Sequence, residues 1–109
     1  LPDEYIDIDV DALDVLDVHG KAYFLEKDGL PTLTASMDGD LTVTDEAGSI
    51  GGTLLDVTAV DSNVALTAAK AITVNMIDAG NGAVTLIAQD GSILDRNDIS
   101  PNIIAGDIA

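Results

Sequence analysis

Carboxylates are the side chains with the clearest capacity for chemistry in this sequence, and they are densest near the N-terminus. An extended strand through residues 6–12 would project Asp7, Asp9 and Asp11 from one face. Calcium binds about six to eight oxygen atoms, so such a row could hold a cation. Blocks of like charge are more often solvated surfaces, and we predict a solvated acidic face without a metal site. The full group of N-terminal acids is Asp3, Glu4, Asp7, Asp9, Asp11, Asp14 and Asp17.

Two segments, Met37–Asp40 and Asp78–Gly82, weakly resemble the glycine–aspartate loops of calcium-binding β-rolls. That motif repeats every nine residues or so and carries tandem glycines, whereas neither of these two segments has adjacent glycines and the sequence repeats over about twenty residues. No Asp-x-Asp-x-Asp-Gly loop is followed by a glutamate at the distance that an EF-hand requires. We therefore expect no β-roll, no EF-hand and no bound cofactor.

The sequence contains few residues that could catalyse a reaction. His19 is the only histidine and precedes Gly20 at a predicted turn, so neither a Ser-His-Asp set elsewhere nor a two-histidine metal site can be built. Paired carboxylates could cleave glycosidic bonds. Such sites also need aromatic or basic residues to hold sugars, and we predict no catalytic residues and no enzyme. The residues that could hold a sugar are Tyr5, Tyr23, Phe24 and Arg96.

The composition favours one folded, acidic domain. The chain has 109 residues, with 20 Asp and Glu against 4 Lys and Arg, for a net charge of −16. Such a field repels nucleic-acid phosphates and anionic lipid headgroups. Disorder is disfavoured because 47% of the residues are hydrophobic, and the absence of cysteine removes disulfides and thiolate metal sites. We expect residues 1–109 to form a single unit, with no segment suited to membrane insertion.

Internal repeats predict how that unit is built. Three segments each combine an alternating strand, a short turn and an isoleucine: Leu41–Ile50, Val64–Ile72 and Val84–Ile93. Their first residues lie 23 and 20 positions apart, and their isoleucines lie 22 and 21 apart. A degenerate earlier copy, Ala22–Leu30, begins 19 residues before Leu41. A period of about 20 to 22 residues is long enough for two or three short strands with corners, so each repeat is predicted to be one coil of a β-solenoid.

The alternation within the repeats predicts which side chains fill the interior. Leu41, Val64 and Val84 should stack in one column. A second column should hold Val43, Leu66 and Leu86. Near the N-terminus the alternation slips, and we place a corner or bulge near Leu13.

Glycine and asparagine are expected at the corners of the coil. We expect the corner glycines to adopt positive φ, and asparagines to stack in ladders. These residues are Gly29, Gly39, Gly48, Gly51, Gly52, Gly80, Gly82 and Gly91, with Asn63, Asn75, Asn81, Asn97 and Asn102.

The repeats resemble those of filamentous-haemagglutinin-type large bacterial adhesins and exoproteins. The resemblance covers roughly residues 6–109 and is clearest over 39–94. It implies a right-handed parallel β-helix that is exported to the cell surface and serves as a stalk or adhesive rod. The chain departs from the family in its high acidity and lacks secretion-domain motifs. The segments that carry the resemblance are Gly39–Thr44, Ala47–Ile50, Asn63–Ala68, Gly82–Leu86 and Gly91–Ile93.

We therefore predict an all-β, right-handed parallel β-helix acting as a structural or adhesive segment of an extracellular bacterial surface protein. The alternatives are a carbohydrate-active β-helix enzyme and a calcium-stabilised extracellular matrix or filament protein. Residues 102–109 begin a further apolar coil, so other chains or further coils are expected at the ends of the solenoid. A surface receptor or glycan is the other expected partner.

Overall fold

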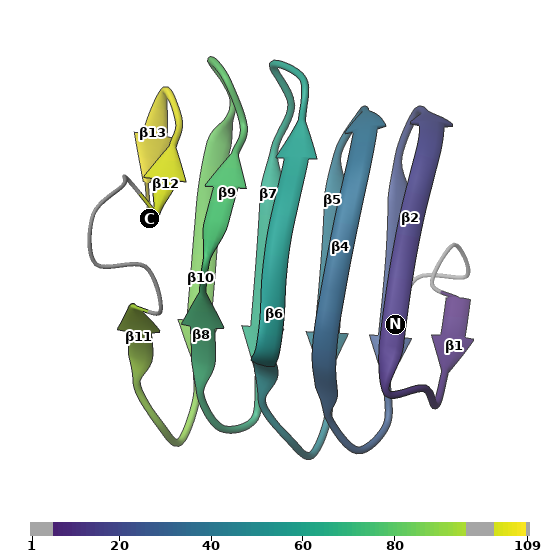
Figure 1. The fold of residues 1–109 in the computed structure, drawn as a ribbon, viewed down its shortest axis with the longest axis vertical. Helices are drawn as coiled ribbons and strands as arrows, with labels where there is room; N and C mark the ends of the chain where they lie inside the picture. Colours follow the sequence, from purple (N-terminus) through teal and green to yellow (C-terminus); the bar gives the residue numbers. More distant parts are fainter. Residues whose placement is uncertain (1–5, 96–101, 109) are drawn as a thin grey trace.

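The chain folds into a β-solenoid of about four turns, as the repeats predict. The computed structural model describes residues 6–95 and 102–108, so Asp3, Glu4, Tyr5, Arg96 and Asn97 lie outside it. The chain alternates between two facing parallel sheets (Figure 1). Strands of the front sheet in Figure 1 run upward, strands of the rear sheet run downward, and successive coils move to the left. The coil is therefore right-handed, as predicted.

The first strands of successive coils form one sheet, and all pairs of neighbouring strands in it are parallel. Its central strands, Ala22–Glu26 (β3), Leu41–Asp45 (β5) and Val64–Ala68 (β7), match the first strands of the predicted repeats. Parallel pairing brings each strand onto the equivalent strand of the next coil. In spatial order the strands are β1 (Ile6–Ile8), β3 (Ala22–Glu26), β5 (Leu41–Asp45), β7 (Val64–Ala68), β10 (Ala83–Ala88) and β13 (Asp107–Ile108).

The second sheet is formed by the return strands and becomes more interrupted toward the C-terminus. Its strands are β2 (Ala12–His19), β4 (Leu30–Asp38), β6 (Ile50–Ala59), β8 (Ile72–Val74), β9 (Met76–Asp78), β11 (Ile93–Asp95) and β12 (Ile103–Ile104). Strands β8 and β9 both pair with β6 and are separated at Asn75. There the Leu55 N–H donates to Asn75 Oδ1 (3.0 Å) and the Asn75 N–H donates to the Leu55 carbonyl (3.1 Å), so the Asn75 side chain supplies one of the two hydrogen bonds between coils at the break.

The predicted columns are confirmed residue by residue. Leu41 pairs with Val64 and Val64 with Val84, while Val43, Leu66 and Leu86 form the neighbouring column. The isoleucines at 50, 72 and 93 also pair in register. The members of these columns on the central coils are buried, with aliphatic side chains stacked directly on one another.

The corner near the N-terminus lies earlier than predicted. A single strand over residues 6–12 is wrong, because β1 ends at Ile8 and β2 begins at Ala12. Residues 9–11 carry the chain from one sheet to the other. The slip in alternation instead corresponds to a β-bulge within β2, between Leu16 and Val18, which adds one residue relative to β4.

Glycine at the corners has two separate roles. Gly39 has a φ of 152°, as the prediction of positive φ requires. Gly82 does not have positive φ, but a Cβ there would collide with the backbone of Ser62 on the preceding coil. Positive φ is likewise wrong for Gly48, Gly52 and Gly91, of which Gly48 and Gly91 are also tightly packed against backbone.

Replacing Leu66 by Asp tests the interior column. The substitution buries an unpaired carboxylate between Val43 and Leu86, so we expect a loss of about 3 to 5 kcal/mol of unfolding free energy, or no folding. Ser36→Asp, at an exposed position of β4, adds the same charge outside the core and should cost little. Denaturant unfolding of both variants is the measurement. Equal midpoints for Leu66→Asp and the parent would mean that the column is wrong.

Candidate functional site

The main cluster of titratable groups lies where the first three coils turn from one sheet to the other. We call Asp9, Glu26, Asp28 and Asp45 the acidic corner. Asp9 follows β1, Glu26 ends β3, Asp28 lies in the next turn, and Asp45 ends β5. Carboxylate oxygens of Asp9, Glu26 and Asp28 lie within 4.8 Å of one another. Glu26 pairs with Asp45 in the strand register, so the two acids occupy the same column.

Glu26 and Asp45 are buried because they close backbone turns. Glu26 is fully buried, and its Oε2 accepts a hydrogen bond from the Val10 N–H (3.1 Å), its Oε1 one from the Asp28 N–H (3.4 Å). Asp45 Oδ1 accepts bonds from the Ala47 N–H (3.1 Å) and the Gly48 N–H (2.8 Å). Each side chain thus satisfies amides that would otherwise lack a partner at the corner.

The two acids differ in how fully their oxygens are satisfied. Both carboxylate oxygens of Glu26 accept backbone bonds, whereas Asp45 Oδ2 is buried without a hydrogen-bond partner. A buried polar atom without a partner costs stability. The acidic corner therefore combines a structural role with a local electrostatic cost.

The crowding of carboxyl groups at the acidic corner raises the pKa of two of them, so these two bind protons more readily. Burial raises the pKa of Glu26, the backbone bonds from Val10 and Asp28 oppose the rise, and the charges of Asp45 and Asp9 add to it. A hydrogen bond with the Asp28 carboxyl raises the pKa of the exposed Asp9. The negative charge of Asp28 and partial desolvation raise this pKa further, and the positive charge of Lys27 lowers it. Chemically, the corner is suited to holding a proton or a hard cation.

The N-terminal row of acids is only partly assembled as predicted. Asp7, Asp9, Asp11 and Asp14 are all exposed, as a solvated acidic surface requires. They do not project from one strand, because Asp9 and Asp11 lie in the corner between β1 and β2. Asp14 accepts a hydrogen bond from the Thr34 hydroxyl (2.7 Å).

The alternation could have located the two buried acids, which sequence reasoning missed. Glu26 and Asp45 occupy the inward-facing positions of their strands, in register with Ala68 and Ala88 of the later coils. An acid at an apolar column position is the signal. His19 Nδ1 lies 3.9 Å from Asp38 Oδ2, and both side chains are exposed. His19 thus pairs with an exposed acid at a corner, as a turn histidine would.

Asn63 and Asn81 follow aspartates of the preceding coil, so the predicted asparagine ladder does not form at these positions. The Asn102 side chain does donate to the Asn75 carbonyl of the preceding coil (3.3 Å). The Asn63 N–H donates to Asp40 Oδ1 (2.8 Å), and the Ala83 N–H donates to Asn63 Oδ1 (2.9 Å). The Asn81 N–H likewise donates to Asp61 Oδ1 (3.0 Å). Asp and Asn side chains therefore connect successive corners through the main chain.

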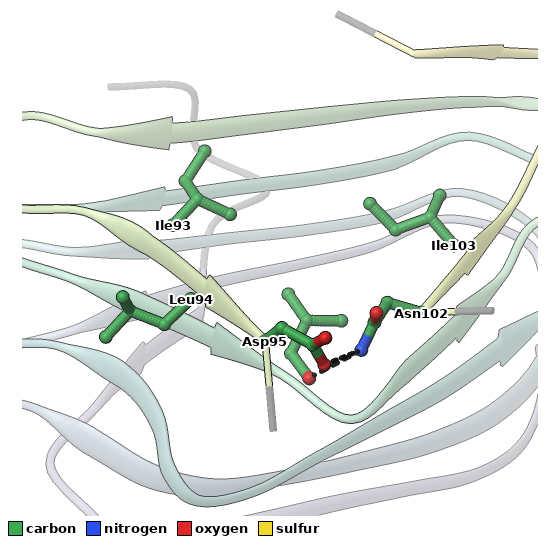
Figure 2. A pocket seen from close by; sticks show the side chains of 6 residues that line it. Ile93, Leu94, Asp95, Asn102 and Ile103 are labelled. Carbon is green, nitrogen blue, oxygen red and sulfur yellow. Dashed lines mark hydrogen bonds between the residues drawn. The ribbon is translucent and has the colours of Figure 1, made fainter. Parts of the chain in front are cut away.

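A small cavity lies near the C-terminal end of the solenoid. Figure 2 shows its lining of aliphatic side chains beside a hydrogen bond from Asn102 Nδ2 to Asp95 Oδ1 (2.8 Å). Its volume of about 160 Å³ is below the 300 Å³ or so of typical small-molecule sites. The lining residues are Val74, Ile93, Leu94, Asp95, Asn102 and Ile103.

Comparison with protein families, with curated proteins and with solved structures gives no match to this chain. In the described segments, no helix is long and apolar enough to cross a membrane.

Lowering the pH from about 7 to about 5 should raise the melting temperature. The folded state takes up protons at Glu26 and Asp9 at a higher pH than the unfolded chain, because both pKa values are raised. Stability then increases as the pH falls toward the raised values, and this gain is complete below the ordinary values. Glu26→Gln removes one of these sites and should reduce the gain.

Glu46→Gln, which removes an exposed carboxylate after β5, is the matched control. It should keep nearly the full gain of the parent. Thermal melts of the three proteins across this pH range measure the difference. If Glu26→Gln shows the same pH dependence as Glu46→Gln and the parent, the pKa of Glu26 is not raised in the folded state.

Added salt should also raise the melting temperature, because screening weakens the self-repulsion of a chain with a net charge of −16. We expect calcium chloride and sodium chloride at equal ionic strength to have the same effect. Melting curves in the two salts make the comparison. A larger calcium effect that disappears in Asp9→Asn would contradict screening alone and locate a cation at the acidic corner.

Proposed function

We propose that this chain is a rod-like structural and adhesive segment of an extracellular bacterial surface protein. The observation that carries the proposal is the in-register stacking of its coils. Each strand pairs with its counterpart in the next coil, and each interior column continues from one coil to the next. An architecture in which units contact only their neighbours can be lengthened without redesign, which suits a stalk.

The outer surface supports binding along the length of the solenoid and not in a single cleft. Along β5 and β7, Thr42, Thr44, Ala65 and Thr67 face outward in paired columns and are half-buried. Side chains this short leave a flat strip across neighbouring coils. Flat, repetitive surfaces favour extended ligands such as another protein surface or a glycan chain.

The location rests on charge and on the resemblance of the repeats to adhesin repeats. A net charge of −16 disfavours nucleic acids and anionic membranes as partners and favours solubility at a cell surface. The described acids are either exposed or used as acceptors at turns, an arrangement typical of a scaffold. The remaining partners are further coils or other chains at the ends of the rod.

Duplicating one coil tests the scaffold role. A second copy of residues 41–63 placed between Asn63 and Val64 preserves the register, because Leu41 pairs with Val64. We expect the lengthened protein to fold, with more β signal in circular dichroism and a melting temperature no lower than that of the parent, since it gains one interface between coils. Failure of the lengthened chain to fold would count against a modular rod.

The enzymatic alternative is tested on the parent protein. A scaffold should release no new reducing ends from a panel of neutral and acidic polysaccharides. Release of reducing ends above a Glu26→Gln and Asp9→Asn background would reject the structural proposal in favour of a carbohydrate-active enzyme that uses the acidic corner.

A further inference from the structure

Glu26 and Asp45 form a pair of buried carboxyl groups in the interior of the solenoid. They occupy paired positions on neighbouring strands, Glu26 at the end of β3 and Asp45 at the end of β5. Neither side chain is more than 1% exposed, and neighbouring strands lie about 4.8 Å apart. In the part of the chain that the structure describes, neither acid forms an ion pair with a Lys, Arg or His side chain. Two carboxyl groups thus lie side by side without a compensating cation.

One oxygen of this pair lacks a hydrogen-bond donor. Asp45 Oδ1 accepts the Ala47 and Gly48 amides, whereas Asp45 Oδ2 is buried without a hydrogen-bond partner. The next residue in its column is Ala68, whose methyl group has no donor to offer, and the preceding residue is Glu26. Within this column, a donor for Oδ2 can therefore come only from Glu26. A carboxyl group donates a hydrogen bond only when it carries a proton.

The hydrogen bonds of Glu26 indicate which of its oxygens can carry that proton. Oε2 accepts the Val10 N–H at 3.1 Å, whereas Oε1 lies 3.4 Å from the Asp28 nitrogen, which is long for an N–H···O bond. Oε1 is therefore the less firmly held oxygen. A proton on Oε1 leaves the bond to Val10 in place and keeps the corner of the first coil closed.

We propose that Glu26 and Asp45 form a binding site for one proton, which Glu26 Oε1 carries and donates to Asp45 Oδ2. The proton comes from solvent, and its binding breaks no covalent bond. It removes one of two adjacent buried charges and supplies the donor that Oδ2 lacks. The pair thus responds to pH, because it carries one negative charge in mildly acidic surroundings and two in more alkaline surroundings.

The other charged groups at this corner determine how readily the pair binds a proton. Burial of Glu26 raises its pKa, and the negative charges of Asp45 and Asp9 raise it further. The positive charge of Lys27 acts on Asp9. The remaining charged groups near the corner are exposed, so water screens them: Asp7, Asp28, Glu46 and Lys70.

Asp45→Asn tests the shared proton. Asn keeps an oxygen acceptor for the Ala47 and Gly48 amides and places a permanent N–H donor where Oδ2 lies. We expect a higher melting temperature than that of the parent at a pH of about 7, and a smaller gain when the pH is lowered to about 5.

Asp56→Asn, the same change at an exposed position of β6, is the matched control for the loss of one charge from the chain. It should keep the pH-dependent gain of the parent. The proposal would be overturned if Asp45→Asn melted below the parent at neutral pH, or if it kept the full gain of the Asp56→Asn control.

Carboxyl titration by NMR follows the proton in the parent itself, so it does not depend on a variant that folds. With isotope-labelled Asp and Glu, one titration step should move the carboxyl signals of Glu26 and Asp45 together. In Asp45→Asn, Glu26 should titrate at a lower pH than in the parent, because a neighbouring negative charge is gone. Movement of the Glu26 signal alone in the parent would contradict a shared proton.

Calcium titration separates a bound proton from a bound cation. At equal ionic strength, calcium and sodium chloride should raise the melting temperatures of the parent and of Asp45→Asn alike. A larger calcium effect in the parent that is absent from Asp45→Asn would show that a cation, and not a proton, binds at Oδ2, and would reject the proposal.

Discussion

In-register parallel pairing between coils is the constraint on which the rest of this structure depends. Each coil donates and accepts backbone hydrogen bonds along its neighbours, so side chains of paired strand residues lie on the equivalent side chains of the next coil. Each column must therefore be filled with side chains that pack well against the same or a similar side chain. Leu, Val and Ile do so in the interior, and their stacking replaces the single packed centre of a globular domain.

The same constraint decides how a polar group can enter the interior. Ala68 and Ala88 fill the last inward position of their strands with small apolar groups, whereas Glu26 and Asp45 occupy that column in the earlier coils. Each acid is tolerated because it accepts the amides of its own turn. Two carboxylates one coil apart still repel each other, and the raised pKa of Glu26 reflects burial together with that repulsion.

The period of the apolar residues was enough to predict the coils and their columns, because column identity depends on alternation and spacing alone. Leu41, Val64 and Val84 are paired as their spacing indicated. The corner at residues 9–11 and the break at Asn75 could not be found in this way. Both involve side-chain hydrogen bonds to the backbone of a neighbouring coil, which leave no periodic signal. The acidic corner was missed for the related reason that acids were assigned to the surface by type instead of by column.

Columns also determine where such a protein can be specific. Along the central coils the outward position of one column holds Ser36, Thr58 and Asp78 in turn, so a ligand on the side of the solenoid meets a different side chain at each coil. A partner that continues the columns must match several of them at once, in both sheets. The pairing that stabilises the interior therefore also sets which side chains any contact along the solenoid must match.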